Sequence, residues 1–142
     1  MVQQIKTSFS IIGDPIGKPR MTQRDVWDKR KAVMKYRDWC DNARETAGLE
    51  PMQKIDANSF FGVIAFAHFR IPKSYSKKKR EAIAGKLCTV KPDTDNVLKA
   101  ICDALFENDE RLSIMQCYKY WSYDDEEPRV DIFFLQKDDM KI

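Results

Sequence analysis

The sequence contains one histidine and four scattered cysteines, which limits the metal and nucleophile chemistry open to it. The cysteines show no Cys-x-x-Cys spacing, so we expect no zinc site and interpret them as reduced, mostly buried thiols. His68 lies in an apolar strand pattern without a partner motif, which argues against a Ser–His hydrolase. No Gly-Lys-Ser or Gly-Lys-Thr follows the first predicted strand, so a Walker-type phosphate loop is excluded.

Long apolar runs are also missing. No stretch approaches the length of a membrane span, and the N-terminal residues show no apolar signal-peptide core. With the cysteines interpreted as reduced, these features lead us to expect a cytoplasmic protein. The hydrophobic content of 43% and charged content of 33% are typical of a globular protein. We expect one domain over residues 1–142, large enough to bury roughly two-thirds of its unfolded surface.

The net charge of +3 conceals a division between two parts of the chain. Residues 1–91 carry 19 Lys and Arg against 9 Asp and Glu, a balance of +10, whereas residues 92–142 carry 6 against 13, a balance of −7. A basic region can hold a polyanion by releasing its counterions. An acidic region that binds a metal ion can then act on the backbone that is held.

Hydrophobic periodicity predicts the secondary structure. Period-2 patterns predict strands at 4–12, 59–70, 112–121 and 130–134, and helical spacing predicts helices at 30–47, at 77–84 and from just after Pro92 to 105. Both alternating faces of 59–70 are apolar, so we expect a central strand covered on both sides. We interpret 122–128 as a hairpin loop joining the last two strands. This order predicts an α/β (α+β-like) fold with a mixed sheet of about four strands and packed helices.

One stretch concentrates charged residues at a helix start. It reads Lys91-Pro-Asp-Thr-Asp-Asn-Val-Leu-Lys-Ala-Ile-Cys-Asp-Ala-Leu105. Pro92 disfavours helix for the residue before it, and Asp93 or Thr94 can cap the helix that follows. Asp95, Lys99 and Asp103 then recur at intervals of four, opposite an apolar face.

Carboxylates at this spacing suit a metal site. Asp93 and Asp95 can turn toward one point and present oxygen ligands to Mg²⁺ or Mn²⁺. Such an ion can polarise a phosphodiester and activate water, and Lys99 could neutralise phosphate charge or orient that water. The alternative interpretation is structural: acids in a first helical turn are favoured by the helix dipole, and Asp95–Lys99 is an ordinary i,i+4 pair.

This stretch resembles the signature of the RusA-type Holliday junction resolvases, with its Asp-x-Asp-Asn, a lysine four residues on, and a following Asp-Ala-Leu. Three further segments resemble the family: Gly17-Lys-Pro-Arg20, Ile71-Pro-Lys-Ser-Tyr-Ser-Lys-Lys-Lys-Arg80, and Asn108-Asp-Glu-Arg111 with Lys119 beyond it. The resemblance covers most of the chain.

The resemblance implies a Mg²⁺-dependent endonuclease, with Mn²⁺ as a possible substitute, that acts as a homodimer on branched DNA in recombination and repair. It implies catalytic roles for Asp93, Asp95, Lys99 and Asp109, and metal binding by the three aspartates. A neighbouring acid, Asp103 or Glu110, is the alternative to Asp109. In a two-fold dimer, two such sites would make paired symmetric nicks that leave 5′-phosphate ends.

Basic side chains are the candidate contacts to the DNA backbone. They are Lys18, Arg20, Arg24, Lys77, Lys78 and Lys119. For the loop and the basic helix, the alternative is a solvated run of charge. Two other functions stay open: a DNA nuclease without preference for junctions, and a non-catalytic DNA-binding protein whose acids only cap a helix and balance charge.

Overall fold

The structure is a computed structural model and describes residues 5–20 and 31–136. Its centre is a four-stranded sheet in the order β1-β4-β2-β3. The strands are β1 (Ser8–Ile12), β2 (Phe60–Phe69), β3 (Ile114–Trp121) and β4 (Arg129–Gln136). β2 pairs parallel with β3 and antiparallel with β4, and β4 pairs antiparallel with β1. The sheet is therefore mixed, as the sequence predicts.

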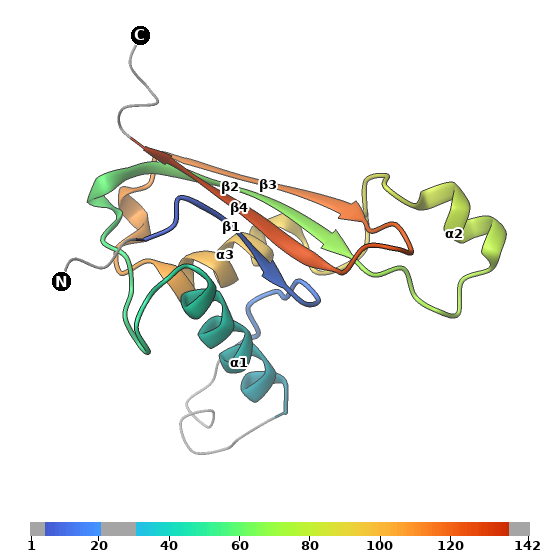
Figure 1. Ribbon diagram of the computed structural model, residues 1–142, viewed down its shortest axis with the longest axis horizontal. Helices are drawn as coiled ribbons and strands as arrows, with labels where there is room; N and C mark the ends of the chain where they lie inside the picture. The colour runs from blue at the N-terminus through green and yellow to red at the C-terminus, as the bar shows by residue number, and fades with distance from the viewer. Residues whose placement is uncertain (1–4, 21–30, 137–142) are drawn as a thin grey trace, which may run out of the picture.

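Two helices cover one face of this sheet, and a third stands apart (Figure 1). The helices are α1 (Lys31–Thr46), α2 (Lys77–Ile83) and α3 (Thr94–Leu105). α1 and α3 pack beneath the sheet and against each other, whereas α2 projects beyond one end of it. The predicted helices are confirmed within one or two residues over the described positions. Two short 3₁₀ helices, η2 (Ala57–Ser59) and η3 (Asp109–Arg111), were not predicted.

The packing of α3 follows from its apolar face. Val97, Ile101 and Leu105 recur at intervals of four and are fully buried. Fully burying side chains of this size stabilises the fold by about 1.5 to 3 kcal/mol each. α3 therefore lies flat on the core, and its two ends are held at fixed places along the sheet.

The last two strands do not form the predicted hairpin, and that prediction is wrong. β2 lies between β3 and β4, and the chain crosses the end of β2, where Ser122 N donates to Phe69 O at 2.8 Å. Residues 122–128 are long enough for this crossing, whereas tight hairpins favour two-residue turns. Central placement gives hydrogen-bond partners to both edges of β2, the most apolar strand.

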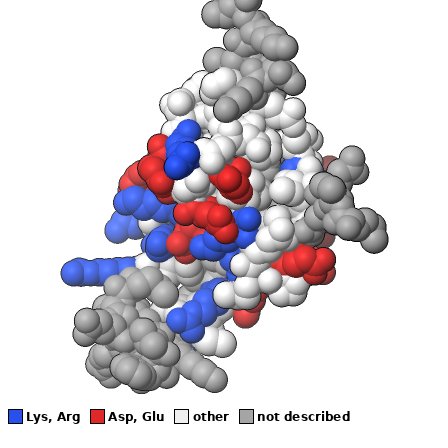
Figure 2. Space-filling model, turned by 90° about the vertical axis from the view of Figure 1, so that its left-hand side faces the viewer, with Lys and Arg blue, Asp and Glu red and all other residues white. Residues whose placement is uncertain are grey.

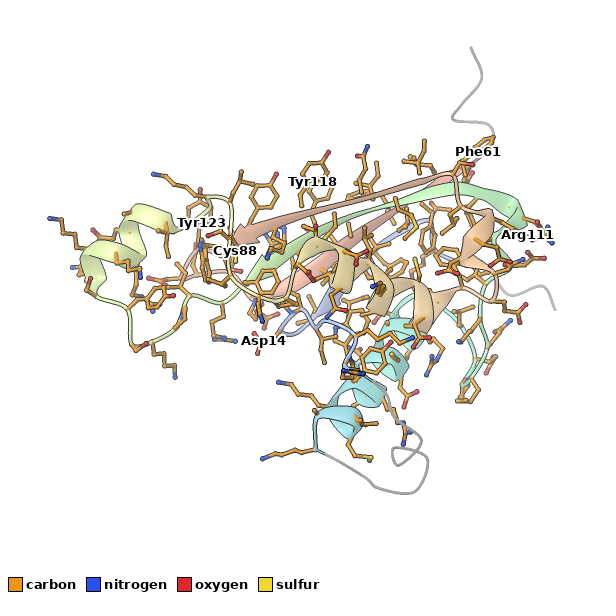
Figure 3. All side chains as sticks on the ribbon, turned by 180° about the vertical axis from the view of Figure 1, so that it is seen from behind. Asp14, Phe61, Cys88, Arg111, Tyr118 and Tyr123 are labelled. Atoms are coloured by element: carbon orange, nitrogen blue, oxygen red, sulfur yellow. The ribbon has the colours of Figure 1, made fainter. Side chains whose placement is uncertain are left out.

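Only one face of β2 is covered by helices, so coverage on both sides, as predicted, is not found in the single chain. The other face carries side chains that we call the aromatic face: Phe66, His68, Tyr118, Tyr120 and Phe133. Phe66 stacks on Tyr118 with ring centroids 5.2 Å apart and meets the edge of Phe133 at 5.8 Å. Tyr118 and Phe133 are 40% and 45% exposed, and Tyr118 points away from the helices (Figure 3).

The cysteines agree with the sequence interpretation in two respects. All four are free, and Cys40, Cys88 and Cys102 are buried while Cys117 is half-buried. Burial raises the pKa of the Cys102 thiol to about 12, with smaller contributions from Asp109 and Asp103.

Across residues 5–20 and 31–136, no helix has the length and apolar character needed to cross a membrane.

Candidate active site

The N-terminus of α3 begins where the sequence predicts. Asp93 is the N-cap residue, and its Oδ1 accepts a hydrogen bond of 3.3 Å from Asn96 N. Thr94 is the first helical residue, so of the two predicted caps Asp93 takes the role. A carboxylate in this position accepts a hydrogen bond from one of the first N–H groups, which have no partner within the helix. Its negative charge also interacts favourably with the positive end of the helix dipole.

Asp93, Asp95 and Lys99 line one shallow depression on the surface, together with Lys91 and Asn96. Lys99 Nζ lies 3.1 Å from Asp95 Oδ2, and the two side chains are 61% and 73% exposed. An exposed i,i+4 pair of this kind stabilises a helix by only a few tenths of a kcal/mol. The pair is thus real but weak, and both side chains are open to a ligand.

The loop after β1 lies directly against this helix start. Lys18 N donates to Asn96 O at 3.3 Å. A Cβ on Gly17 would lie 2.5 Å from Asn96 Nδ2 and 2.8 Å from Pro92 Cβ, so only glycine permits this approach. The predicted DNA-contacting Lys18 is therefore beside the acid motif.

Lys18 is not directed only to solvent. Its Nζ lies 3.2 Å from Asp103 Oδ1, and Tyr36 OH donates to Asp103 Oδ2 at 2.5 Å. Partial burial alone would raise the pKa of the Asp103 carboxyl, but the hydrogen bonds from Tyr36 and Lys18 outweigh burial and lower it. Asp103 therefore joins α1, α3 and the loop after β1, which is a structural role.

Asp109 lies far from Asp93 and Asp95. It opens η3, beyond the C-terminal end of α3, and a helix of twelve residues spans about 18 Å. Figure 3 shows this separation, because Cys88, before α3, and Arg111, in η3, lie toward opposite ends of that helix. Within the described residues, no group of three His, Cys, Asp or Glu side chains is placed to hold a metal ion. The predicted three-aspartate set is therefore not assembled in one chain.

Contacts from η2 hold Asp109 at that end. Asn108 Oδ1 accepts a 2.9 Å hydrogen bond from Ala57 N, and Arg111 donates to Asn58 Oδ1 at 2.5 Å. Figure 2 views this end of the molecule, where Lys and Arg are interspersed with Asp and Glu rather than separated from them. The sequence predicted neither η2 nor these contacts.

The surroundings of Lys119 are not those expected of a DNA contact. It is 9% exposed, and its Nζ donates to Val90 O and, at 2.7 Å, to Pro92 O. Reaching a phosphate would break both bonds and leave the two carbonyls without these donors. Its position beneath the loop that precedes Asp93 favours a structural link to the acid motif.

The other basic side chains of the loop after β1 and of α2 differ in their surroundings. Lys77 and Lys78 are exposed on α2, and Arg20 is exposed in the loop after β1. Arg80 instead anchors α2, since it donates to Asp124 Oδ1 at 2.6 Å and to Pro72 O at 2.9 Å. Arg24 lies outside the described residues.

His68 belongs to the opposite side of the sheet from α3. Its Nε2 lies 3.2 Å from Asp131 Oδ2, and its ring stacks on Tyr120. Burial, and then the nearby Arg129 charge, lower the pKa of His68, despite the opposing effect of Asp131. The sole histidine therefore lies on the other face of the sheet from α3 and pairs with Asp131 rather than with a nucleophile.

Comparison with known proteins identifies the family. Residues 13–133 match the family described as Endodeoxyribonuclease RusA. The chain is also 30% identical, over an alignment of 143 residues, to the uncharacterized protein YqaN of Bacillus subtilis (strain 168), covering 90% of this chain and 94% of that protein. No solved structure matches the chain. The chain belongs to the RusA endodeoxyribonuclease family, which confirms the resemblance read from the sequence.

The contacts of Asp103 should contribute to the stability of the fold. Tyr36→Phe should lower the free energy of unfolding by about 1.5 kcal/mol at pH 7, because a hydrogen bond to a charged group is lost. The folded-state pKa of Asp103 is depressed, so its stabilising effect is present above the unfolded pKa and is lost as pH falls through the folded value. The difference from wild type should therefore shrink below about pH 4.

Urea unfolding of wild type, Tyr36→Phe and Asp103→Asn at several pH values measures this effect. Tyr123→Phe, at an exposed position, is the matched control and should change stability little. A loss in Tyr36→Phe that stays constant from pH 7 to pH 3 would contradict the assignment of the bond to the ionised carboxylate.

Proposed function

We propose that this protein is a Mg²⁺-dependent endonuclease that resolves four-way DNA junctions in recombination and repair. Family membership supports the nuclease class. The observation that carries the proposal is the exposed depression at the start of α3, where Asp93, Asp95 and Lys99 come together. Two carboxylates and a lysine at a helix N-terminus suit metal-assisted chemistry on a phosphodiester.

The depression fits a magnesium ion by the chemistry of its ligands. Mg²⁺ in phosphate-processing sites is commonly bound by one or two carboxylates, with water and substrate phosphate completing the shell. The acidic ligands here are Asp93 and Asp95, and no histidine or cysteine lines the depression, which suits Mg²⁺ or Mn²⁺ rather than zinc. Both side chains are exposed, so a hydrated ion can reach them from solvent. A bound ion would polarise the scissile phosphate and lower the pKa of a coordinated water.

The protein's own groups would then act on charge and orientation. Asp93 keeps one carboxylate oxygen beyond the Oδ1 that caps the helix. Lys99, paired with Asp95, lies where its ammonium can meet the negative charge that develops on phosphate. The N–H groups at the start of α3 favour an anion at the same place. Hydrolysis in this arrangement would leave 5′-phosphate and 3′-hydroxyl ends.

The position of Asp109 makes it a weaker candidate ligand than Asp93 and Asp95. It matches the family's third acid, yet it lies a helix length from Asp93 and is held there by η2. We therefore favour a site built on two carboxylates of one chain, with Asp109 tested separately.

Sequence-independent binding would come from basic side chains near this site and beyond it. We propose Lys18 and Arg20 in the loop after β1, and Lys77 and Lys78 on the projecting α2, as contacts to DNA phosphates. Lys18 would have to exchange Asp103 for phosphate. We propose Arg24 as a further phosphate contact from its sequence position alone.

We also propose that two chains associate through the aromatic face. β2 has apolar side chains on both faces, a pattern typical of strands covered on both sides, and it pairs in parallel with β3. Helices cover one of those faces, so a second copy of the chain is the partner that supplies the missing layer. A two-fold contact requires one surface to be self-complementary, and an exposed face rich in aromatic rings can meet that need. Two acid sites in such a dimer suit paired nicks.

Substitution of the acids separates these roles. Asp95→Asn should reduce cleavage of a four-way junction by about 100-fold or more, because it removes a charged ligand from the proposed site. Junction binding in Ca²⁺ should stay within about threefold of wild type, because phosphate contacts dominate affinity. Single-turnover cleavage and gel-shift titration measure the two effects.

Asp109→Asn should retain much more activity than Asp95→Asn, since it lies outside the depression. Equal loss in both variants would contradict a two-carboxylate site and would require Asp109 to reach the reacting phosphate. Full activity of Asp95→Asn would remove the α3 motif from catalysis altogether.

The dimer is tested by Phe133→Glu, which places a charge on the aromatic face without touching the helix-covered core. Wild type should sediment at twice the chain mass, and Phe133→Glu should sediment as a monomer, because a buried unpaired charge is costly. Met34→Glu on α1, at an exposed apolar position, is the matched control and should stay dimeric. A monomeric wild type, or a Phe133→Glu dimer of unchanged affinity, would contradict the proposed interface.

A further inference from the structure

Lys119 is one of three charged or polar side chains that are buried in the described part of the chain, and its surroundings explain why it is there. It extends from the face of β3 that carries Cys117 and Trp121, toward the helices. Its Nζ lies 5.7 Å from the centroid of the Phe69 ring and donates to the carbonyl oxygens of Val90 and Pro92. A buried ammonium must be matched by acceptors, and here two backbone carbonyls provide them.

The carbonyls of Val90 and Pro92 belong to the segment that leads into Asp93, the N-cap residue of α3. The segment runs along the outer edge of β3: Gly85 N donates to Trp121 O, Trp121 N to Lys86 O, and Cys88 N to Lys119 O, all at 2.8 to 2.9 Å. Cys88 contributes the last of these backbone bonds. Thr89, Val90 and Lys91 beyond it are exposed.

The five residues from Thr89 to Asp93 therefore leave the sheet edge before the helix begins. Asp93 must still arrive with its carboxylate over Asn96 N to cap α3 and face the depression. The Lys119 side chain contacts this part of the chain from the core side, because its ammonium donates to the carbonyl oxygens of Val90 and Pro92.

We propose that Lys119 is a positioning residue for the acid site. By binding the Val90 and Pro92 carbonyls, it keeps Asp93 in place. This inference rests on the proposed nuclease function for its effect on catalysis, but not for its effect on structure. Lysine suits the place because its compact ammonium presents three donors on a long apolar stem. Displacing a reacting group by about 1 Å can cost about 100-fold in rate, so a loose loop would reduce turnover.

The test compares Lys119→Met with Lys86→Met. Methionine keeps most of the stem volume and removes both hydrogen bonds, and Lys86 lies on the same segment with an exposed side chain. Hydrogen exchange of the amides of residues 89–96 should be about tenfold faster in Lys119→Met, with exchange at α1 and β2 as the internal reference for global stability. Lys86→Met should match wild type.

Activity gives the second readout. Single-turnover cleavage by Lys119→Met should fall by about 100-fold while junction affinity in Ca²⁺ stays within about threefold of wild type. Mn²⁺ affinity, measured by electron spin resonance without DNA, should also fall. If Lys119→Met does not fold, Lys119→Gln replaces it, keeps a donor for one of the two carbonyls, and should show smaller effects in the same direction.

Two results would overturn the inference. Unchanged exchange at 89–96 would show that the loop does not depend on Lys119. A loss of junction affinity as large as the loss of cleavage would make Lys119 a DNA contact instead. If wild type itself fails to cut DNA, the nuclease proposal fails, and the exchange measurement still decides whether Lys119 holds the loop.

Discussion

The burial of one face of α3 against the sheet determines where the acid motif of this protein lies. Val97, Ile101 and Leu105 are fully buried, so the helix cannot slide or rotate without exposing them. This contact places Asp93 beside the end of β3, over Lys119, and places Asp109 near the start of β3. The same packing that displays Asp95 and Lys99 on the outer surface therefore separates Asp109 from Asp93 and Asp95.

Around this helix the molecule has three surfaces of different character. The depression at the start of α3 is polar and exposed. The strongly basic α2 projects beyond one end of the sheet (Figure 1). The aromatic face, with Tyr118, lies on the side of the sheet away from the helices (Figure 3). Arg80 and Asp124 tie α2 to the loop between β3 and β4. Catalysis, DNA binding and association would thus use separate surfaces of one sheet-and-helix core.

Local patterns in the sequence predict the elements and the helix start, because capping and periodicity depend on neighbouring residues. The alternation in residues 112–121 also places Lys119 on the face of Cys117 and Trp121, which was a signal for a buried lysine. Strand partners could not be predicted, since the pairing of β2 with β3 and β4 joins distant segments. The position of Asp109 depends on hydrogen bonds between η2 and η3. These bonds join segments about 50 residues apart, so a match to a local sequence motif does not reveal them.

The most direct measurement is cleavage of a labelled synthetic four-way junction by the wild-type protein, with and without Mg²⁺, beside a linear duplex of the same sequence. We expect symmetric nicks that require Mg²⁺ and are confined to the junction. Equal cutting of both substrates would contradict junction resolution while leaving a nuclease. Tight binding without cutting under Mg²⁺ or Mn²⁺ would contradict the catalytic role of the acids at the start of α3.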